Sequence, residues 1–184
     1  MKHRKYIGIA SALIFIYNIA IAQSEKIIQL NTGLTDKQCS GSAQILNALL
    51  ANEYVLYTKT LNYHWNIKGV HFGSLHTFFG DQYEILLKII DSIAERIKAL
   101  NQHAIGTLQE FSRLSSLTEQ VDQLLSEKEM VQDLLNNHEA IIRQLRIDLQ
   151  RAADEFNDMG TNNFLTDLLE KHEKMAWMLR AHLQ

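Results

Sequence analysis

Apolar residues recur at alternating steps of three and four along most of the chain, the spacing that gives an α-helix one buried face. This pattern predicts four long helices, over about residues 36–66, 74–101, 126–156 and 161–184. The second shows it most regularly, with steps of 4, 3, 4, 3, 4 and 3 between Phe79, Tyr83, Leu86, Ile90, Ile93, Ile97 and Leu100. Four helices that each carry one apolar stripe predict a helical bundle.

The breaks between these stretches predict how the helices are connected. Gly69 and Gly73 interrupt the pattern between the first two helices, and residues 157–160 do so between the last two, where Thr161 is the predicted N-cap. The link over about residues 102–125 is much longer. The chain has no proline, which favours helices without interruption.

The long link itself has a helix-start pattern. Ser116 and Glu119 are three residues apart and could form a capping box, so a short extra helix is predicted to begin within residues 115–119. Two short links and one long crossover favour a ferritin-like arrangement over a simple up-and-down bundle. The predicted fold is therefore all-α, a ferritin-like four-helix bundle with a long crossover that contains a short extra helix.

The first 22 residues differ from the rest of the chain. Residues 6–22 are almost wholly apolar and end in Ala20-Ile21-Ala22, and before them stands a basic start, Lys2, His3, Arg4 and Lys5. This pattern predicts a secretory signal peptide over residues 1–22 and a single mature domain over residues 23–184. An uncleaved N-terminal anchor is the alternative. A functional signal means export, with the periplasm as the expected compartment, and a non-functional one leaves the protein in the cytoplasm.

Charge and cysteine content exclude some classes of function. The whole chain has 18 Lys and Arg against 21 Asp and Glu. Removal of residues 1–22 leaves 15 basic residues against 21 acidic ones, a net charge of −6. Such a chain is a poor non-specific ligand for DNA, because that affinity depends on Lys and Arg at phosphates. Cys39 is the only cysteine, so neither an intrachain disulfide nor a zinc-thiolate site is expected.

Two pairs of residues could bind a metal ion, His64 with His76 and Asp91 with Glu95. Imidazole and carboxylate without thiolate suit iron, manganese or zinc. Asp91 and Glu95 share one face of the second helix, and that face points away from the helix's apolar stripe. A solvated acidic face is the alternative interpretation of these two carboxylates.

Helix geometry limits how these residues could meet. His76 and Asp91 are 15 residues apart on one helix, which corresponds to about 22 Å. They cannot bind one ion within one chain, but two such helices packed antiparallel across a two-fold axis would make two identical sites. His64 could join His76 across the short loop. The chain has no Glu-x-x-His motif, so a di-iron centre inside the bundle is not expected, and His138 and His172 are interpreted as packed core residues.

Four stretches of the sequence resemble one family. The chain is similar to the Dps family, the DNA-protection-during-starvation miniferritins, over about residues 40–184. The resemblance rests on Leu61-Asn62-Tyr63-His64-Trp65-Asn66-Ile67-Lys68-Gly69, on Phe72, Leu75-His76 and Phe79, on Asp91-Ser92-Ile93-Ala94-Glu95-Arg96, and on the last helix, Glu173-Lys174-Met175-Ala176-Trp177-Met178-Leu179-Arg180-Ala181-His182-Leu183.

The resemblance implies a hollow dodecamer that oxidises ferrous iron, often with hydrogen peroxide, and stores it as a ferric mineral. It implies an iron centre between two subunits, with His64 and His76 from one and Asp91 and Glu95 from the other. Trp65 corresponds to the tryptophan beside that centre and could donate an electron, with packing as the alternative.

Two features depart from the family. An acid commonly lies four residues after the second histidine, where this chain has Gly80 followed by Asp81, and a one-residue shift turns a helical side chain by about 100°. The second iron position is therefore expected to be weaker. The export signal is the other departure. Alternative functions are a shell that binds DNA or another polyanion, and a surface interaction protein with little catalysis.

Overall fold

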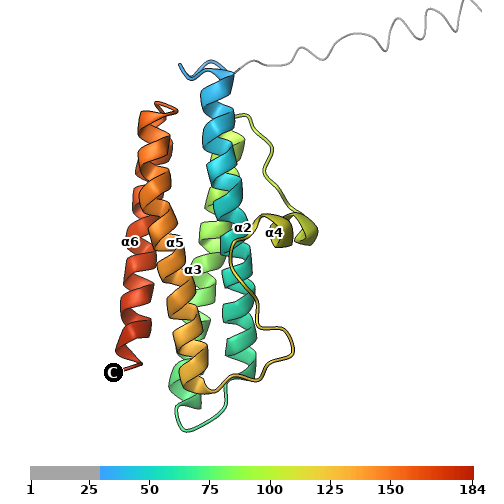
Figure 1. Cartoon of the computed structure of the whole chain (residues 1–184), viewed down its shortest axis with the longest axis vertical. Helices are drawn as coiled ribbons and strands as arrows, with labels where there is room; N and C mark the ends of the chain where they lie inside the picture. Colours follow the sequence, from blue (N-terminus) through green and yellow to red (C-terminus); the bar gives the residue numbers. More distant parts are fainter. Residues whose placement is uncertain (1–29) are drawn as a thin grey trace, which may run out of the picture. The chain divides into compact units, whose positions relative to one another are not determined.

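Four long helices lie side by side in the part of the chain that the structure, a computed structural model, describes, residues 30–184 (Figure 1). The helices are α2 (Asp36–Asn66), α3 (Phe72–Ala99), the short α4 (Leu108–Leu114), α5 (Glu127–Asp154) and α6 (Met159–Ala181). No strand occurs within residues 30–184. The all-α fold and the four long helices are confirmed, with ends within three residues of the predicted ones. The predicted signal peptide over residues 1–22 lies outside the described residues.

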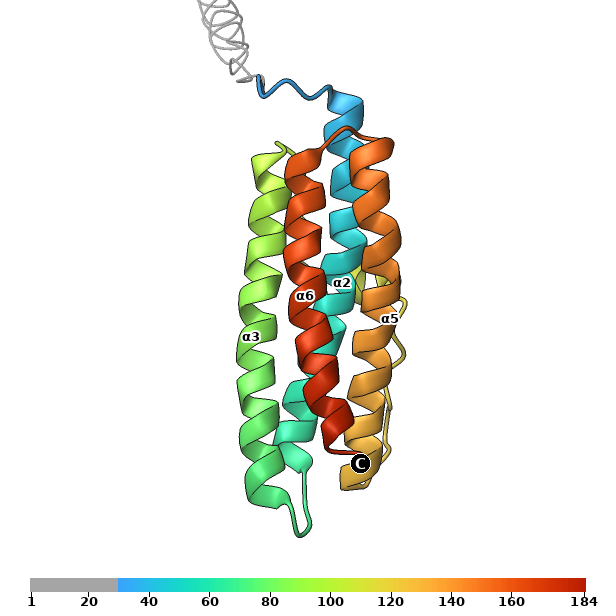
Figure 2. The same cartoon turned by 90° about the vertical axis from the view of Figure 1, so that its left-hand side faces the viewer.

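The bundle consists of two helical hairpins, α2 with α3 and α5 with α6, whose helices pack most extensively on each other (Figure 2). The backbone N–H of His71, before α3, donates to Glu127 in the first turn of α5. Near the other end, Arg96 of α3 contacts Asp158, the residue before α6. α3 and α5 therefore run in the same direction, so the link between them crosses the length of the bundle, as the ferritin-like prediction requires.

The core is formed by apolar side chains from all four long helices. Its largest fully buried members are Phe79, Leu46, Leu50, Leu56, Leu86, Ile93, Ile97, Leu134, Ile141, Leu145, Leu165 and Leu168. The four members on α3, Phe79, Leu86, Ile93 and Ile97, lie on the apolar stripe predicted for that helix. No helix in residues 30–184 is both long and apolar enough to cross a membrane.

The extra helix in the crossover lies earlier than predicted. α4 ends at Leu114, and its capping box is formed by Thr107 and Glu110. Residues 115–120 are not helical, so the predicted box of Ser116 and Glu119 is wrong. The cause is a competing contact, because the backbone N–H of Ser116 donates to the side chain of Asn52 on α2 at 2.8 Å.

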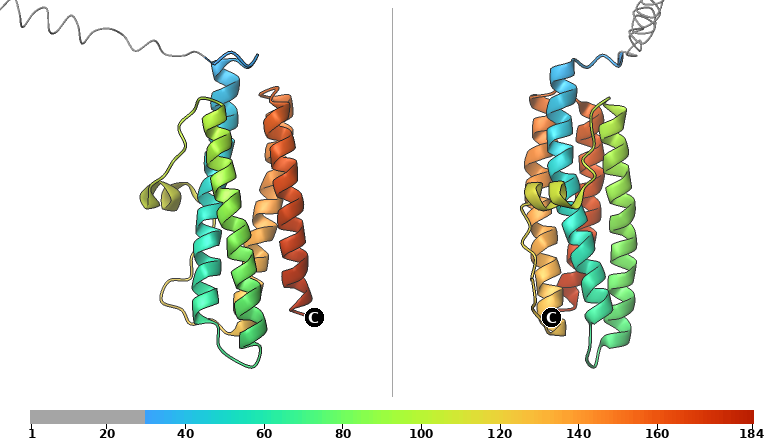
Figure 3. Two further views of the ribbon diagram at one scale, coloured as in Figure 1. Left: turned by 180° about the vertical axis from the view of Figure 1, so that it is seen from behind. Right: turned by 90° about the vertical axis from the view of Figure 1, so that its right-hand side faces the viewer.

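The crossover is fixed to the outer side of α2, where α4 also lies (Figure 3). Asn47 of α2 binds the backbone at His103 and Ile105 through its side-chain amide. Further along α2, Lys59 donates to the backbone oxygen of Thr118 at 2.7 Å. These contacts satisfy backbone groups of a link that has little secondary structure of its own.

α6 begins at Met159, with Asp158 as its N-cap. The predicted N-cap, Thr161, is instead the third residue of the helix, and its backbone N–H and hydroxyl both donate to the Asp158 carboxylate. Arg96 also donates to this carboxylate, at 2.9 Å. Although burial opposes the shift, the hydrogen bonds from Thr161 lower the pKa of Asp158. This contact joins the end of α3 that carries Glu95 to the start of α6.

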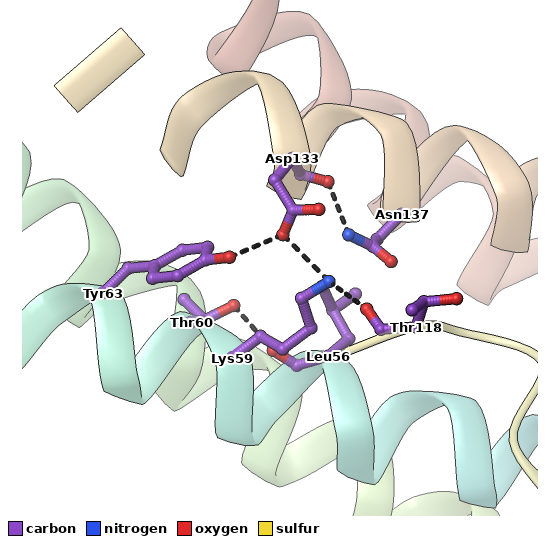
Figure 4. Close-up of polar contacts among 7 residues, drawn as sticks. All are labelled: Leu56, Lys59, Thr60, Tyr63, Thr118, Asp133 and Asn137. Carbon is purple, nitrogen blue, oxygen red and sulfur yellow. Dashed lines mark hydrogen bonds and ion pairs between the residues drawn. The ribbon is translucent and has the colours of Figure 1, made fainter. Parts of the chain in front are cut away.

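A buried polar cluster joins α2, α5 and the crossover (Figure 4). Lys59 is 4% exposed and lies 2.8 Å from the Asp133 carboxylate. The hydroxyl of Tyr63 donates to the same oxygen of Asp133 at 2.7 Å. Burial and the neighbouring carboxylate raise the pKa of Tyr63, so this phenol stays protonated. The cluster matters for the site because His64 follows Tyr63 directly on α2.

Candidate metal centre

His64, near the end of α2, and His76, in the second turn of α3, stack against each other across the short α2–α3 loop. Their ring centroids are 3.8 Å apart and their planes differ by 20°. Nδ1 of His64 lies 2.7 Å from the backbone oxygen of His76, and Nδ1 of His76 lies 2.9 Å from the backbone oxygen of His64. The structure thus brings this predicted pair together through two reciprocal hydrogen bonds.

These hydrogen bonds determine which ring nitrogen is available to a metal ion. A carbonyl oxygen only accepts, so Nδ1 of His64 and Nδ1 of His76 must each carry a proton. In the neutral rings the lone pairs therefore lie on the two Nε2 atoms. A backbone carbonyl that holds Nδ1–H is the usual support for a histidine that binds metal through Nε2. Both side chains are half-buried.

Aromatic rings surround the histidine pair. Phe72 lies against His76, with ring centroids 5.2 Å apart, and Tyr83 meets His64 edge to face at the same centroid distance. Gly80 faces His64, and a Cβ there would lie 3.4 Å from Cε1 of that ring, an ordinary contact. Glycine has no side chain, so residue 80 supplies no metal ligand. The next residue, Asp81, lies on the exposed face of α3.

Asp91 and Glu95 are both exposed, on the side of α3 opposite the buried Ile93 and Ile97. Fifteen residues of helix separate Asp91 from His76, about 22 Å along the axis. Within residues 30–184 no three His, Cys, Asp or Glu side chains are grouped so that they could hold one metal ion. The structure of one chain thus unites the two histidines and leaves the two carboxylates apart from them.

Trp65 is 68% exposed beside the histidine pair, and Trp177 on α6 is 62% exposed. Tryptophan and other aromatic side chains are enriched in protein–protein interfaces. The position of Trp65, next to His64 and pointing outward, is compatible with an interface that includes the candidate centre.

A second polar cluster lies inside the bundle, away from these residues. His138 and His172 are fully buried, and their Nδ1 atoms are 3.0 Å apart. Nε2 of His172 lies 2.8 Å from the carboxylate of Glu53, which is also fully buried, although not at a hydrogen-bonding angle. The expectation that both histidines are packed core residues is confirmed. The buried acid beside them was not predicted, although Glu53 lies four residues after Leu49 and three before Leu56, the spacing of a buried helix face.

Burial and the neighbouring His172 hold the pKa of His138 well below its ordinary value. An unfolded histidine takes up a proton below about pH 6.5, whereas folded His138 does not until the pH is lower. The contribution of neutral His138 to the free energy of unfolding is therefore complete above pH 6.5. It decreases as the pH falls below that value, by up to about 1.4 kcal/mol per pH unit. The free energy of unfolding between pH 7.5 and 5, at fixed protein concentration, should fall less steeply in His138→Asn. The exposed control His103→Asn should keep the wild-type slope, and equal slopes in all three proteins would contradict this prediction.

Relatives and solved structures identify the fold family. Residues 43–184 match the ferritin-like domain family. An uncharacterized low temperature-induced protein of Nostoc sp. is 44% identical over 85% of this chain and 87% of its own length. The DNA protection during starvation protein of Helicobacter pylori is 32% identical over 76% of this chain and 96% of its own length. The chain belongs to the Dps family.

The crystal structure of the Vibrio cholerae O1 Dps protein, described as a ferritin-like diiron-carboxylate protein, superposes on this chain with a TM-score of 0.79. The two are 33% identical, and the match covers 88% of this chain and all of that one. Membership of the Dps family implies iron binding, iron sequestration and protection from oxidative damage, and the Dps structures suggest a homo-oligomer.

Proposed function

We propose that this Dps protein is a ferroxidase whose iron centre is shared by two subunits. His64 and His76 of one subunit would bind ferrous iron together with Asp91 and Glu95 of the partner. The observation that carries the proposal is the reciprocal pair of Nδ1 hydrogen bonds, which leaves an Nε2 lone pair on each of two half-buried rings stacked 3.8 Å apart. Within residues 30–184 no carboxylate is grouped with the two imidazoles, so a metal ion held by them would take its further ligands from another subunit.

The exposed face of α3 supports the two-subunit arrangement. It begins with the turn that holds His76 and ends with Asp91 and Glu95. Two copies of α3 packed antiparallel about a two-fold axis would bring each histidine pair to the partner's carboxylates, so one contact would create two centres. Exposed Trp65 would be covered by the same contact and lie beside the iron, where packing or electron donation is its proposed role.

The ligand set suits iron oxidation. Neutral imidazole binds ferrous iron well, and carboxylate oxygens favour the more highly charged ferric ion, so together they promote loss of an electron at the site. Hydrogen peroxide would be the oxidant and would take two electrons in all from ferrous iron. Ferric product would be stored as mineral inside a hollow oligomer, for which twelve subunits is the expected number.

The charge of the chain supports iron storage over DNA binding. Residues 23–184 carry a net charge of −6, which favours cations and repels phosphates. The apolar segment at residues 1–22 supports export, with the periplasm as the proposed compartment. Iron oxidation at the protein would consume ferrous iron and peroxide there before they react with each other in free solution.

The proposal is tested by anaerobic loading of the assembled protein with ferrous iron, followed by hydrogen peroxide, with ferric absorbance recorded in the ultraviolet. We expect a fast rise with about two irons oxidised per peroxide, and at least a hundredfold slower rise in Asp91→Ala. Asp81→Ala is the matched control, an exposed acid on the same helix outside the proposed centre, and should keep the wild-type rate. A wild-type trace no faster than buffer would rule out the ferroxidase.

A further inference from the structure

Three tyrosines form a continuous string that starts at the candidate centre. Tyr83 on α3 contacts His64, with ring centroids 5.2 Å apart. From there the centroid separations are 6.2 Å to Tyr57 and a further 6.2 Å to Tyr54, both on α2. Tyr54 stacks on Phe111 of α4 at 4.2 Å. All three phenols are half-buried, so the string runs along the α2–α3 surface from the histidines to the crossover.

Reduction of peroxide at the proposed centre requires more electrons than one ferrous ion supplies, and the tyrosine string could provide the missing one. Gly80 provides no ligand beside His64, so each proposed centre has two imidazoles and two carboxylates, a donor set for one iron ion. One ferrous ion supplies one electron, whereas reduction of peroxide to water requires two. If peroxide receives only one electron, it releases a hydroxyl radical. A second electron donor near the iron would prevent that.

We propose that Tyr83 supplies the second electron and that Tyr57 and Tyr54 carry the resulting oxidising equivalent away from the centre. In this step the O–O bond of peroxide breaks and both oxygens leave as water. Iron gives one electron and becomes ferric, and Tyr83 gives the other together with its phenolic proton and becomes a tyrosyl radical. Solvent supplies one further proton. The inference rests on the proposed ferroxidase.

The radical then moves outward by exchange of an electron and a proton between neighbouring phenols, from Tyr83 to Tyr57 to Tyr54. Phe111 has no hydroxyl and is much harder to oxidise, so the transfer ends at Tyr54. A later ferrous ion can give one electron to the radical and become ferric, and the phenolic oxygen takes one proton from solvent to restore tyrosine. The overall stoichiometry therefore stays at two irons per peroxide, as expected for the ferroxidase.

These rings also pack the helices together, but packing uses the ring and electron transfer requires the hydroxyl. Tyrosine-to-phenylalanine variants therefore separate the two roles. Tyr63 is the matched control. It is the one tyrosine in residues 30–184 outside the string, and its hydroxyl donates to Asp133 of α5. Its hydroxyl is held by a carboxylate and belongs to none of the contacts of the string.

The test loads the assembled protein with one ferrous ion per subunit, mixes it with peroxide and freezes it within milliseconds. Electron paramagnetic resonance reports the tyrosyl radical, and ferric absorbance is recorded in parallel. We expect a tyrosyl signal in wild type and Tyr63→Phe, and at least a fivefold smaller one in Tyr83→Phe. In Tyr57→Phe the signal should remain, and peptide mapping should find oxidation at Tyr83 where wild type shows it at Tyr54.

Ferric iron without a tyrosyl signal in wild type would overturn the relay and leave the ferroxidase intact. So would a signal of wild-type size in Tyr83→Phe. Oxidation that still reaches Tyr54 in Tyr57→Phe would overturn the proposed order, and this variant decides the question even if Tyr83→Phe does not fold. Absence of ferric iron in wild type would instead refute the ferroxidase on which the relay rests.

Discussion

Shells assembled from a mixture of His64→Ala and Asp91→Ala subunits are expected to oxidise iron, although each variant alone is inactive. In a mixed two-fold pair, one centre combines both substitutions and the other combines the intact histidines of one subunit with the intact carboxylates of its partner. If subunits pair at random, half of the pairs are mixed, so about a quarter of the wild-type rate should return. The rate of ferric absorbance after peroxide addition measures this recovery.

A mixture of His64→Ala and His76→Ala subunits is the matched control. Both substitutions then affect the histidine half of the centre. Each centre takes its two histidines from one subunit and therefore lacks one of them, so no activity should return. Recovery in this control would show that ligands are exchanged in some other way. No recovery in the first mixture would show that one chain supplies all the ligands.

Asp133→Asn is expected to destabilise the protein by about 3 kcal/mol, because it leaves the ammonium group of Lys59 buried without a counter-charge. It also weakens the hydrogen bond of Tyr63 and loosens the crossover, which Lys59 holds through Thr118 (Figure 4). Urea denaturation at fixed protein concentration would measure the loss in the free energy of unfolding.

The control is Asp167→Asn, which removes an exposed ion pair with Lys171 on α6. Such pairs contribute about 0.5 kcal/mol or less, so this variant should be close to wild type. If Asp133→Asn also lost less than 1 kcal/mol, the buried cluster would not stabilise the junction of α2, α5 and the crossover.

The four long helices were predictable because each buries one face. A buried helix face requires an apolar residue at every third or fourth position, and this spacing is visible in the sequence. The position of α4 was not, since Ser116 had two possible partners. A capping box with Glu119 is visible in the sequence, whereas Asn52, 64 residues away, becomes its partner only in the folded chain. Asp158 displaced Thr161 as the N-cap of α6 for a similar reason, its added contact with Arg96.

The candidate centre was only partly predictable. Two histidines on either side of a short loop could be expected to meet, and they do. The reciprocal hydrogen bonds that free both Nε2 atoms depend on backbone carbonyls, which a sequence does not distinguish. The contact of Tyr83 with His64 does not follow from the sequence, because the apolar spacing places Tyr83 in the core, whereas the structure buries Gln82 and leaves Tyr83 half-buried against His64.

The most direct test of the shared centre is the position of iron itself. Crystals of the assembled protein, soaked anaerobically with ferrous iron, would be measured by anomalous diffraction at the iron edge. We expect iron bonded to Nε2 of His64 and His76 of one subunit and to the carboxylates of the partner subunit's Asp91 and the partner subunit's Glu95. Iron bound only by residues of a single chain, at Glu53 and His172 in the core for example, would contradict it.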